Sequence, residues 1–154
     1  MRRKDREITD INEICKILSK CESLTLALFD EPYPYAVPLN FGYELVKNEL
    51  RLYFHGANAG KKLELIKQNP KAAFSADTSK EVSLSEKACN STMYYESVTG
   101  SGDIKILEND KIHALSVIME HYGIKNSTFD ERSVAKVCVM ELTVKHITGK
   151  KHEK

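Results

Sequence analysis

The feature that most constrains the fold is the alternation of apolar and polar residues with a period of two. In residues 50–55, Leu50, Leu52 and Phe54 fall on one face and Arg51, Tyr53 and His55 on the other, which is the pattern of a half-buried strand. Residues 24–29 alternate in the same way. Further strands are predicted at 33–41, 72–76, 94–107 and 134–147.

Proline and glycine refine the positions of these strands. Pro34 and Pro38 cannot donate to a ladder, so part of 33–41 is predicted at a sheet edge. Gly100 and Gly102 predict a bulge or a sharp bend within 94–107. Residues 77–92 are polar and weakly patterned, and they are predicted to form a long loop, while 150–154 is predicted as a charged tail.

Helical periodicity is confined to three segments. Asp10 is predicted to cap a helix that buries Ile11, Ile14, Leu18 and Cys21. A short helix is expected from Lys61 to about Gln68, and a third is expected from a cap at Asn109 or Asp110 to Gly123. Few helices among several antiparallel strands predict a mainly β fold, a small closed or split barrel with helices on its outside. Residues 1–154 are predicted to form a single domain.

Charge and composition exclude several classes of protein. The 154 residues include 23 Lys and Arg and 22 Asp and Glu, for a net charge of +1. This balance argues against a strongly basic nucleic-acid binder. The apolar runs fall far short of the ~20 residues of a membrane helix, and no apolar stretch follows the basic N-terminus. We therefore expect a cytoplasmic protein with neither nucleic acid nor membrane as a partner.

The cysteines and histidines show no metal-ligand spacing. Cys15, Cys21, Cys89 and Cys138 form no CxxC pair, and thiols in the cytoplasm are expected to remain reduced. Two of the five histidines, His113 and His121, lie eight residues apart on one predicted helix, where a solvated face explains them. No metal site is predicted.

The start of the short helix carries an unusual charge pattern. Gly60 precedes Lys61 and Lys62, although the partial positive charge at a helix N-terminus disfavours cations. Two lysines in this position are favourable around an anion such as phosphate; the alternative is that both simply point into water. Because His55 ends the preceding strand, His55, Lys61 and Lys62 are predicted to converge at one end of the barrel.

The segment Val37, Pro38, Leu39, Asn40 and Phe41 is a second candidate for ligand binding. Its proline interrupts the ladder while most of its neighbours are apolar. A flat ligand that lay against this strand would find free backbone groups for hydrogen bonds. An anion site and a flat apolar wall on one barrel predict a ligand that has both a phosphate and a ring.

At this point the chain resembles the nitroimidazole-resistance (Nim) family, which belongs to the FMN-binding split-barrel, or pyridoxamine 5′-phosphate oxidase-like, superfamily. The resemblance rests on blocks that follow one another over nearly the whole chain. They are MRRKDREI at 1–8, YAVPLNFGY at 35–43, LYFHGA at 52–57, GKK at 60–62, NP at 69–70, TMYYESVTGSG at 92–102 and ITGK at 147–150.

The resemblance implies a six-stranded split barrel that works as a homodimer with two flavin sites in its interface. It places residues 37–41 along the isoalloxazine and His55, Lys61 and Lys62 at the phosphate. It also places Tyr95, Ser97 and Val98 near the interface. The implied activity is reduction of a small electrophile, such as a nitroimidazole, by FMN that a nicotinamide has reduced; His55 is the candidate catalytic residue.

The sequence departs from the family near residue 91. Family members often carry an aromatic side chain there, whereas this chain has Ser91, so the wall of the substrate pocket is expected to differ. Cys89 lies just before it; an inert thiol in a loop is the stronger interpretation, and a pocket-lining thiol is the alternative.

Two other functions remain open on the sequence alone. A pyridoxamine-phosphate oxidase proper fits less well, because the chain is short and lacks an arginine-rich set for a second phosphate. The other is a non-catalytic protein that binds FMN, FAD or haem for sensing, storage or transfer. Haem stays open because a single histidine can ligate it and His55, His113 and His121 are available.

Overall fold

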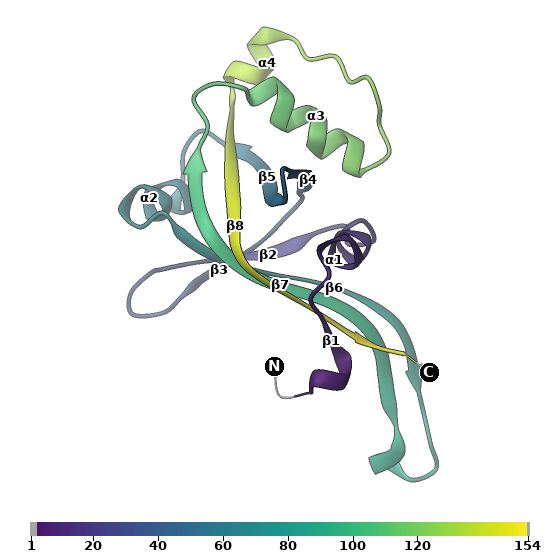
Figure 1. Cartoon of the computed structure of the whole chain (residues 1–154). Coiled ribbons are helices and arrows are strands. Elements are labelled where there is room, and N and C mark those ends of the chain that lie inside the picture. The colour runs from purple at the N-terminus through teal and green to yellow at the C-terminus, as the bar shows by residue number, and fades with distance from the viewer. Residues whose placement is uncertain (1–2, 154) are drawn as a thin grey trace.

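In the computed structural model, the described residues 3–153 (with the backbone alone at 79 and 80) contain eight strands in one antiparallel sheet. Their order is β3-β2-β6-β7-β8-β5-β4, and β1 pairs with β8 beside this path. The path does not close into a ring, and helices pack against it (Figure 1). The predicted mainly β split-barrel architecture is confirmed, with eight strands in the described residues instead of the six that the resemblance implies.

The strands are β1 (Glu7–Ile8), β2 (Leu24–Leu28), β3 (Tyr35–Leu39), β4 (Gly42–Val46), β5 (Glu49–Ala57), β6 (Lys71–Ser83), β7 (Thr92–Ile106) and β8 (Val137–His152). The helices are α1 (Ile11–Leu18), α2 (Lys61–Gln68), α3 (Lys111–His121) and α4 (Glu131–Ala135), with 3₁₀ turns η1 (Lys4–Arg6) and η2 (Ala88–Asn90). The predicted sheet edge is confirmed, because β3 stands at one end of the strand order.

Local signals in the sequence explain several of these boundaries. The Asp10 carboxylate accepts hydrogen bonds from the backbone N–H groups of Asn12 and Glu13, at 2.9 and 3.0 Å, and so caps α1. Gly123, with φ 83°, follows α3 in the left-handed region. Asp110 precedes α3 but makes no side-chain cap, so only its position was predicted correctly.

The irregularity predicted around Gly100 and Gly102 is found at Ser101/Gly102, where the register of β7 with β8 shifts. The extra residue of this bulge, Lys145, lies on β8 and not within β7. A Cβ on Gly102 would lie 2.0 Å from the carbonyl oxygen of Thr143, so only glycine allows this close approach. β7 and β8 curve together through the molecule in Figure 1.

The core has two parts. The larger one packs α1 and α2 against the inner faces of β2, β5, β6, β7 and β8. The smaller one lies under α3 and includes Tyr53, which the sequence pattern placed on a polar face. That expectation was wrong because α3 covers this face of β5; the Tyr53 hydroxyl donates to the Glu44 carboxylate at 2.5 Å.

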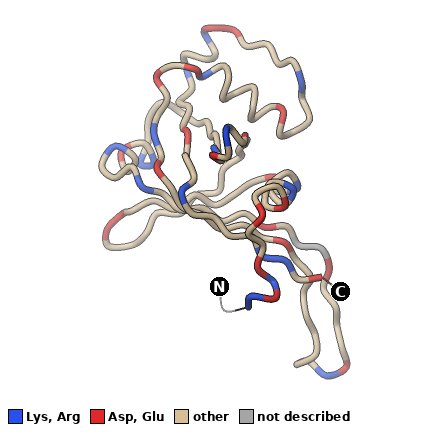
Figure 2. Tube along the Cα trace, in the orientation of Figure 1, with Lys and Arg blue, Asp and Glu red and all other residues tan. Residues whose placement is uncertain are grey.

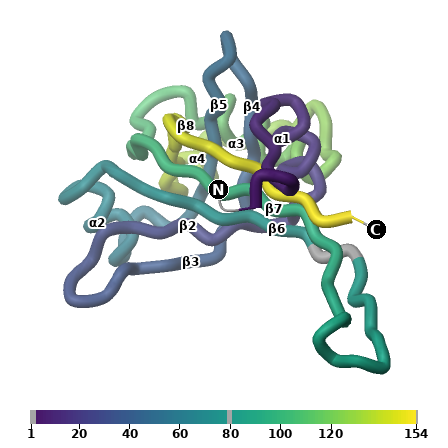
Figure 3. Tube along the Cα trace, turned by 60° about the horizontal axis from the view of Figure 1, so that its bottom comes forward, coloured from purple at the N-terminus to yellow at the C-terminus, as the bar shows by residue number. Residues whose placement is uncertain are grey.

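Residues 77–92 are not a long loop. β6 continues to Ser83 and β7 begins at Thr92, so the connection between them spans only residues 84–91. β8 last pairs with β7 at Tyr95. The two-stranded ribbon beyond this point and its connection, residues 81–94, project from the body and are called the arm below (Figures 1 and 3).

One further expectation is corrected, and two elements of the structure were not predicted. Residues 150–152 belong to β8, where Lys150 and His152 pair with β7, and so are not a tail. β4 and the short helix α4 were not predicted. β4 forms a hairpin with β5 through Lys47 and Asn48, both with positive φ; without a glycine, this turn has a weak sequence signal.

Candidate functional site

The candidate phosphate end is built where β5 ends and α2 begins. Gly60 stands at the N-cap of α2 with φ 127°. Because glycine has no side chain that could cap the helix, it leaves the first backbone N–H groups of α2 uncapped. Lys61 and Lys62 occupy the first turn, as predicted. Figure 2 shows positively charged residues on and around α2.

Lys62 is the half-buried cation of this region. A Cβ built on Gly56 would lie 3.2 Å from Lys62 Nζ, so the ammonium rests against the glycine of β5 in the space that a side chain would fill. Burial lowers the pKa of Lys62. Within the part of the chain that the structure describes, no carboxylate forms an ion pair with it. Lys62 is therefore a desolvated positive charge suited to an anionic ligand.

Lys61 is placed differently from its neighbour. It is exposed, its ammonium forms an ion pair with Asp30 at 2.5 Å, and it lies 5.8 Å from the ring centroid of Tyr35. These contacts connect the start of α2 to the start of β3. Because Lys61 already has a carboxylate partner at the surface, it offers an incoming phosphate less than Lys62 does.

His55 flanks the same strand end from the other face. Side chains alternate along β5, whose register with β8 is regular from Arg51 to Ala57. His55 therefore points away from the face on which Lys62 covers Gly56, and it is exposed. The structure does not gather His55, Lys61 and Lys62 into one cluster; it places Lys62 and His55 on opposite sides of the end of β5.

The predicted flat wall, residues 37–41, divides into two parts. Val37, Pro38 and Leu39 belong to the edge strand β3, which pairs with β2 alone among the described strands. Asn40 and Phe41 are held in place by Tyr122. The free backbone edge that the sequence analysis expected is thus limited to β3.

The contacts of Tyr122 explain how the chain leaves β3. Its hydroxyl donates to the carbonyl of Glu22 at 2.5 Å, and it accepts from the backbone N–H of Phe41 at 3.2 Å and the side-chain amide of Asn40 at 3.1 Å. Phe41 is fully buried, and its backbone N–H is already bonded to the Tyr122 hydroxyl.

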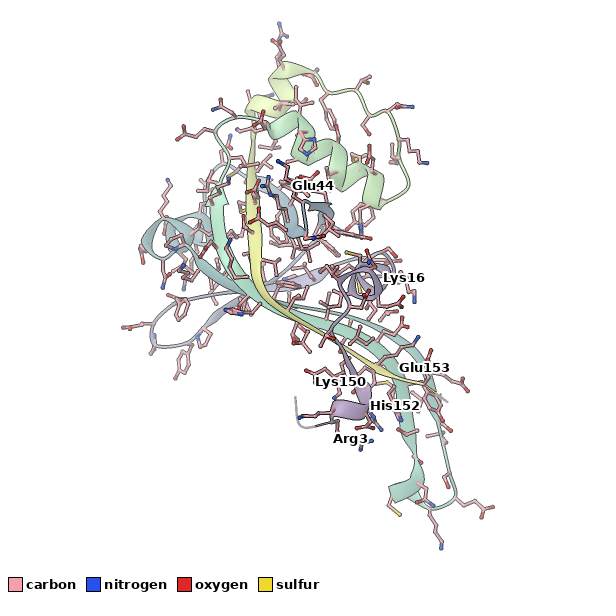
Figure 4. The ribbon with its side chains drawn as sticks, viewed as in Figure 1. Arg3, Lys16, Glu44, Lys150, His152 and Glu153 are labelled. Atoms are coloured by element: carbon pink, nitrogen blue, oxygen red, sulfur yellow. The ribbon has the colours of Figure 1, made fainter. Side chains whose placement is uncertain are left out.

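The third group of predicted residues lies on β7. Val98 is fully buried in the core, whereas Ser97 and Tyr95 face the outer side of the sheet. Lys150 Nζ lies 5.3 Å from the Tyr95 ring centroid, and its hydrogen bond to the hydroxyl lowers the pKa of Tyr95. Figure 4 shows Lys150 and His152 together at the base of the arm.

Strand order separates this third group from the wall. β2 and β6 lie between β3 and β7, so the two groups are roughly 14 Å apart across the sheet at the usual strand spacing. Within one chain they do not form a single pocket.

The two helix histidines are engaged in contacts within the chain. His113 Nε2 lies 3.1 Å from the Glu44 carboxylate, and His121 Nε2 lies 2.8 Å from the Cys21 carbonyl oxygen. Among residues 3–153, leaving out the side chains of 79 and 80, no three His, Cys, Asp or Glu residues are placed to share a metal ion.

Cys89 and Ser91 lie at the end of the arm. Cys89 is exposed, and the Ser91 hydroxyl accepts a hydrogen bond from the backbone N–H of Ser85 at 3.0 Å. The other three cysteines are free and half-buried or buried, and burial raises the pKa of Cys15 and Cys138.

Sequence reasoning missed three residues that shape the region: Asp30, Gly56 and Tyr122. Gly56 had a usable signal, since an isolated glycine inside a strand often marks a close approach. The partnership of Asp30 with Lys61 joins segments 31 residues apart in the chain, and no local pattern reveals it.

The chain matches the family model of pyridoxamine 5′-phosphate oxidase over residues 10–151. A search of curated proteins found no match. Among solved structures, the chain is similar to a candidate 5-nitroimidazole antibiotic resistance protein from Bacteroides thetaiotaomicron. The two are 31% identical with a TM-score of 0.79, over 94% of this chain and 85% of that one.

Two more distant structures share the fold. A flavocytochrome from Azotobacter vinelandii is 14% identical with a TM-score of 0.81, over 100% of this chain and 72% of that one. An FAD and heme binding protein from Mycobacterium smegmatis is 20% identical with a TM-score of 0.80, over 97% and 74%. Of the helices in the described residues, none is long and apolar enough to span a membrane.

Proposed function

Because the chain belongs to the pyridoxamine 5′-phosphate oxidase-like family, as its sequence resemblance predicted, we propose that it is an FMN-dependent oxidoreductase. It takes electrons from NADH or NADPH and passes them to a small electrophile such as a nitroimidazole. The similarity to a candidate nitroimidazole resistance protein supports this substrate class.

The observation that carries the proposal is the environment of Lys62. Its ammonium occupies the space beside Gly56, is partly desolvated and pairs with no carboxylate of the described residues. Such a charge is unfavourable by itself and becomes favourable when a phosphate binds beside it at the start of a helix. The residues present therefore fit the phosphate of FMN.

A bound flavin supplies two-electron transfer between a nicotinamide and an electrophile. The residues of this chain hold and orient it. Lys62 neutralises the phosphate. Lys61 adds a second positive charge when it leaves its ion pair with Asp30. Val37, Pro38 and Leu39 offer the open edge of β3 to the ring. His55, the candidate catalytic residue, lies on the side of the β5 end opposite Lys62, so it does not share the phosphate site.

We also propose that the working unit is a homodimer. Tyr95 and Ser97 are separated from β3 by two strands of their own sheet, so they reach a flavin held on β3 only in a second copy. The outer face on which they lie is built mainly of small or polar residues, among them Ser75 and Thr99, which are exposed. A second sheet can approach such a face closely.

The identity of the bound pigment tests the proposal first. The purified protein is expected to carry a yellow chromophore that is released on denaturation and identified as FMN by chromatography and mass. A haem spectrum, or FAD as the released flavin, would replace the assignment of FMN. Flavin that stays bound without any nicotinamide-driven turnover would favour a carrier over an enzyme.

A further inference from the structure

The arm carries an exposed apolar face with no covering element among the described residues. Val82 and Met93 are cross-strand partners, with exposed fractions of 60% and 44%. Leu84, directly after the end of β6, is 82% exposed. Figure 2 shows that the arm has few charges between its base and its tip. Three large apolar side chains on a narrow ribbon indicate a docking surface rather than a solvated loop.

An apolar groove lies at the opposite end of the same sheet. It has a volume of about 640 Å³, and its lining includes Ala27, Phe29, Pro34, Ala73, Ser101 and His146. Phe29 is 64% exposed. Charged residues, including the ion pair of Lys71 with Asp103, lie along the groove. Figures 1 and 3 show the β2–β3 connection at one side of the molecule and the arm at the other.

The arm and the groove share one face. Met93 and Ser101 are eight residues apart on β7, and the register of β7 with β6 gives β7 no extra residue between them. Side chains an even number of residues apart in a strand point the same way. The β-bulge between Ser79 and Glu81 on β6 turns Val82 to this face as well. Eight residues of strand separate the two features by roughly 26 Å.

This arrangement is self-complementary. A chain cannot fold its own arm back onto a groove that lies along the same strand. Two of these sheets can pack face to face about a two-fold axis that lies between them and runs across the strands. This axis places the arm of each chain over the groove of the other. An axis parallel to the strands would instead place arm against arm and leave both grooves open.

We propose that the arm of each chain docks its apolar face, formed by Val82, Leu84 and Met93, into the groove of a second copy. The contact is reciprocal and occurs twice in the dimer. It extends the interface beyond the flat sheet faces, and it accounts for a ribbon that contributes nothing to the core of its own chain. This inference rests on the homodimer proposed above.

The test is an inter-chain cross-link. A photoreactive benzophenone side chain is placed at Leu84, and the protein is mixed with isotopically labelled wild-type chains before illumination. Links from Leu84 to labelled residues 27–34, 71–73, 101–103 or 145–146 are expected. Links to the partner's residues 81–94, links only within one chain, or no dimer at all would overturn the proposal.

A matched pair of variants gives a second readout. Leu84→Asp is expected to raise the dimer dissociation constant at least tenfold in sedimentation, whereas Ser85→Asp, its exposed neighbour, leaves it unchanged. Equal constants for the two variants would also overturn the proposal. Flavin content is measured in the same samples: FMN-loaded dimers whose links avoid the groove would refute arm docking and leave the proposed function standing. Cross-links to the groove in dimers that hold no flavin would support arm docking and contradict the proposed function.

Discussion

Replacing Lys62 with methionine is expected to weaken FMN binding while leaving the apoprotein as stable as the parent or more stable. Methionine keeps an unbranched side chain, one atom shorter than that of lysine, and the helix propensity of α2, and it removes the charge. In the apoprotein that charge is partly buried beside Gly56 without a carboxylate partner among the described residues. Its removal therefore relieves desolvation and breaks no ion pair.

The expected loss of affinity follows from one contact. A charge-assisted hydrogen bond to phosphate contributes about 1.5–3 kcal/mol, so the Kd for FMN should rise about tenfold to a hundredfold. Riboflavin lacks the phosphate, and its Kd should stay within about twofold. Lys61→Met should cost less than Lys62→Met, because Lys61 already pairs with Asp30 at the surface.

The assay is flavin fluorescence titration of the apoproteins, paired with their thermal melts. Lys67→Met is the matched control, since Lys67 is an exposed cation at the far end of the same helix. The reasoning is refuted if Lys62→Met and Lys67→Met bind FMN equally well. It is also refuted if Lys62→Met lowers riboflavin affinity as much as FMN affinity, or if its apoprotein melts well below the parent.

Four further outcomes are expected. In the wild-type protein, FMN should bind at least about tenfold more tightly than riboflavin; equal affinities by titration would mean that the start of α2 faces solvent. The pKa of Lys62 is lower in the folded protein than the 10.5 of the free side chain, so between these two values the unfolded chain binds more protons than the folded one. The advantage of Lys62→Met in apoprotein stability should therefore shrink as pH rises through this window; an advantage that grows would contradict the assigned burial. Flavin should lower the dimer dissociation constant, because a ligand held by both chains stabilises their association; sedimentation constants that are the same with and without flavin would remove the shared site. Tyr122→Phe should destabilise the fold by about 0.5–1.5 kcal/mol in urea titration, since it removes the hydroxyl that bonds groups of Glu22, Asn40 and Phe41; an unchanged midpoint would show that water replaces it.

The strands that bury one face were predictable from the sequence. Leu50, Leu52 and Phe54 are all buried, as their spacing required, and Asp10 caps α1 where it was expected. These features depend on neighbours within a few residues. Pro34 and Pro38 likewise placed β3 at an edge, because a missing backbone donor has the same consequence in any sheet.

The arm and the covered face of β5 could not be predicted in this way. In the arm only Val82 and Leu84 alternate with polar neighbours, and so short a stretch does not separate a strand from a loop. Tyr53 became buried only because α3, more than fifty residues later, packs on it. Such tertiary contacts override the local pattern.

The candidate site was predicted in part. The residue types at the start of α2 indicated an anion site, yet their division into a paired Lys61, a half-buried Lys62 and an opposed His55 depends on Asp30, Gly56 and strand alternation. The assignment of residues to the flavin ring remains a prediction, because one chain alone does not bring β3 and Tyr95 together.

The most direct test of the central claim is an anaerobic redox cycle followed in the visible flavin band. The FMN-loaded protein is mixed with NADH or NADPH and then with a nitroimidazole. We expect the band to bleach with at least one nucleotide and to return on addition of the nitro compound, which takes two electrons in each cycle. With excess nucleotide, three such cycles should supply the six electrons that convert the nitro group to the amine. A bound flavin that stays oxidised with both nucleotides, or that stays reduced in the presence of the nitro compound, would contradict the account.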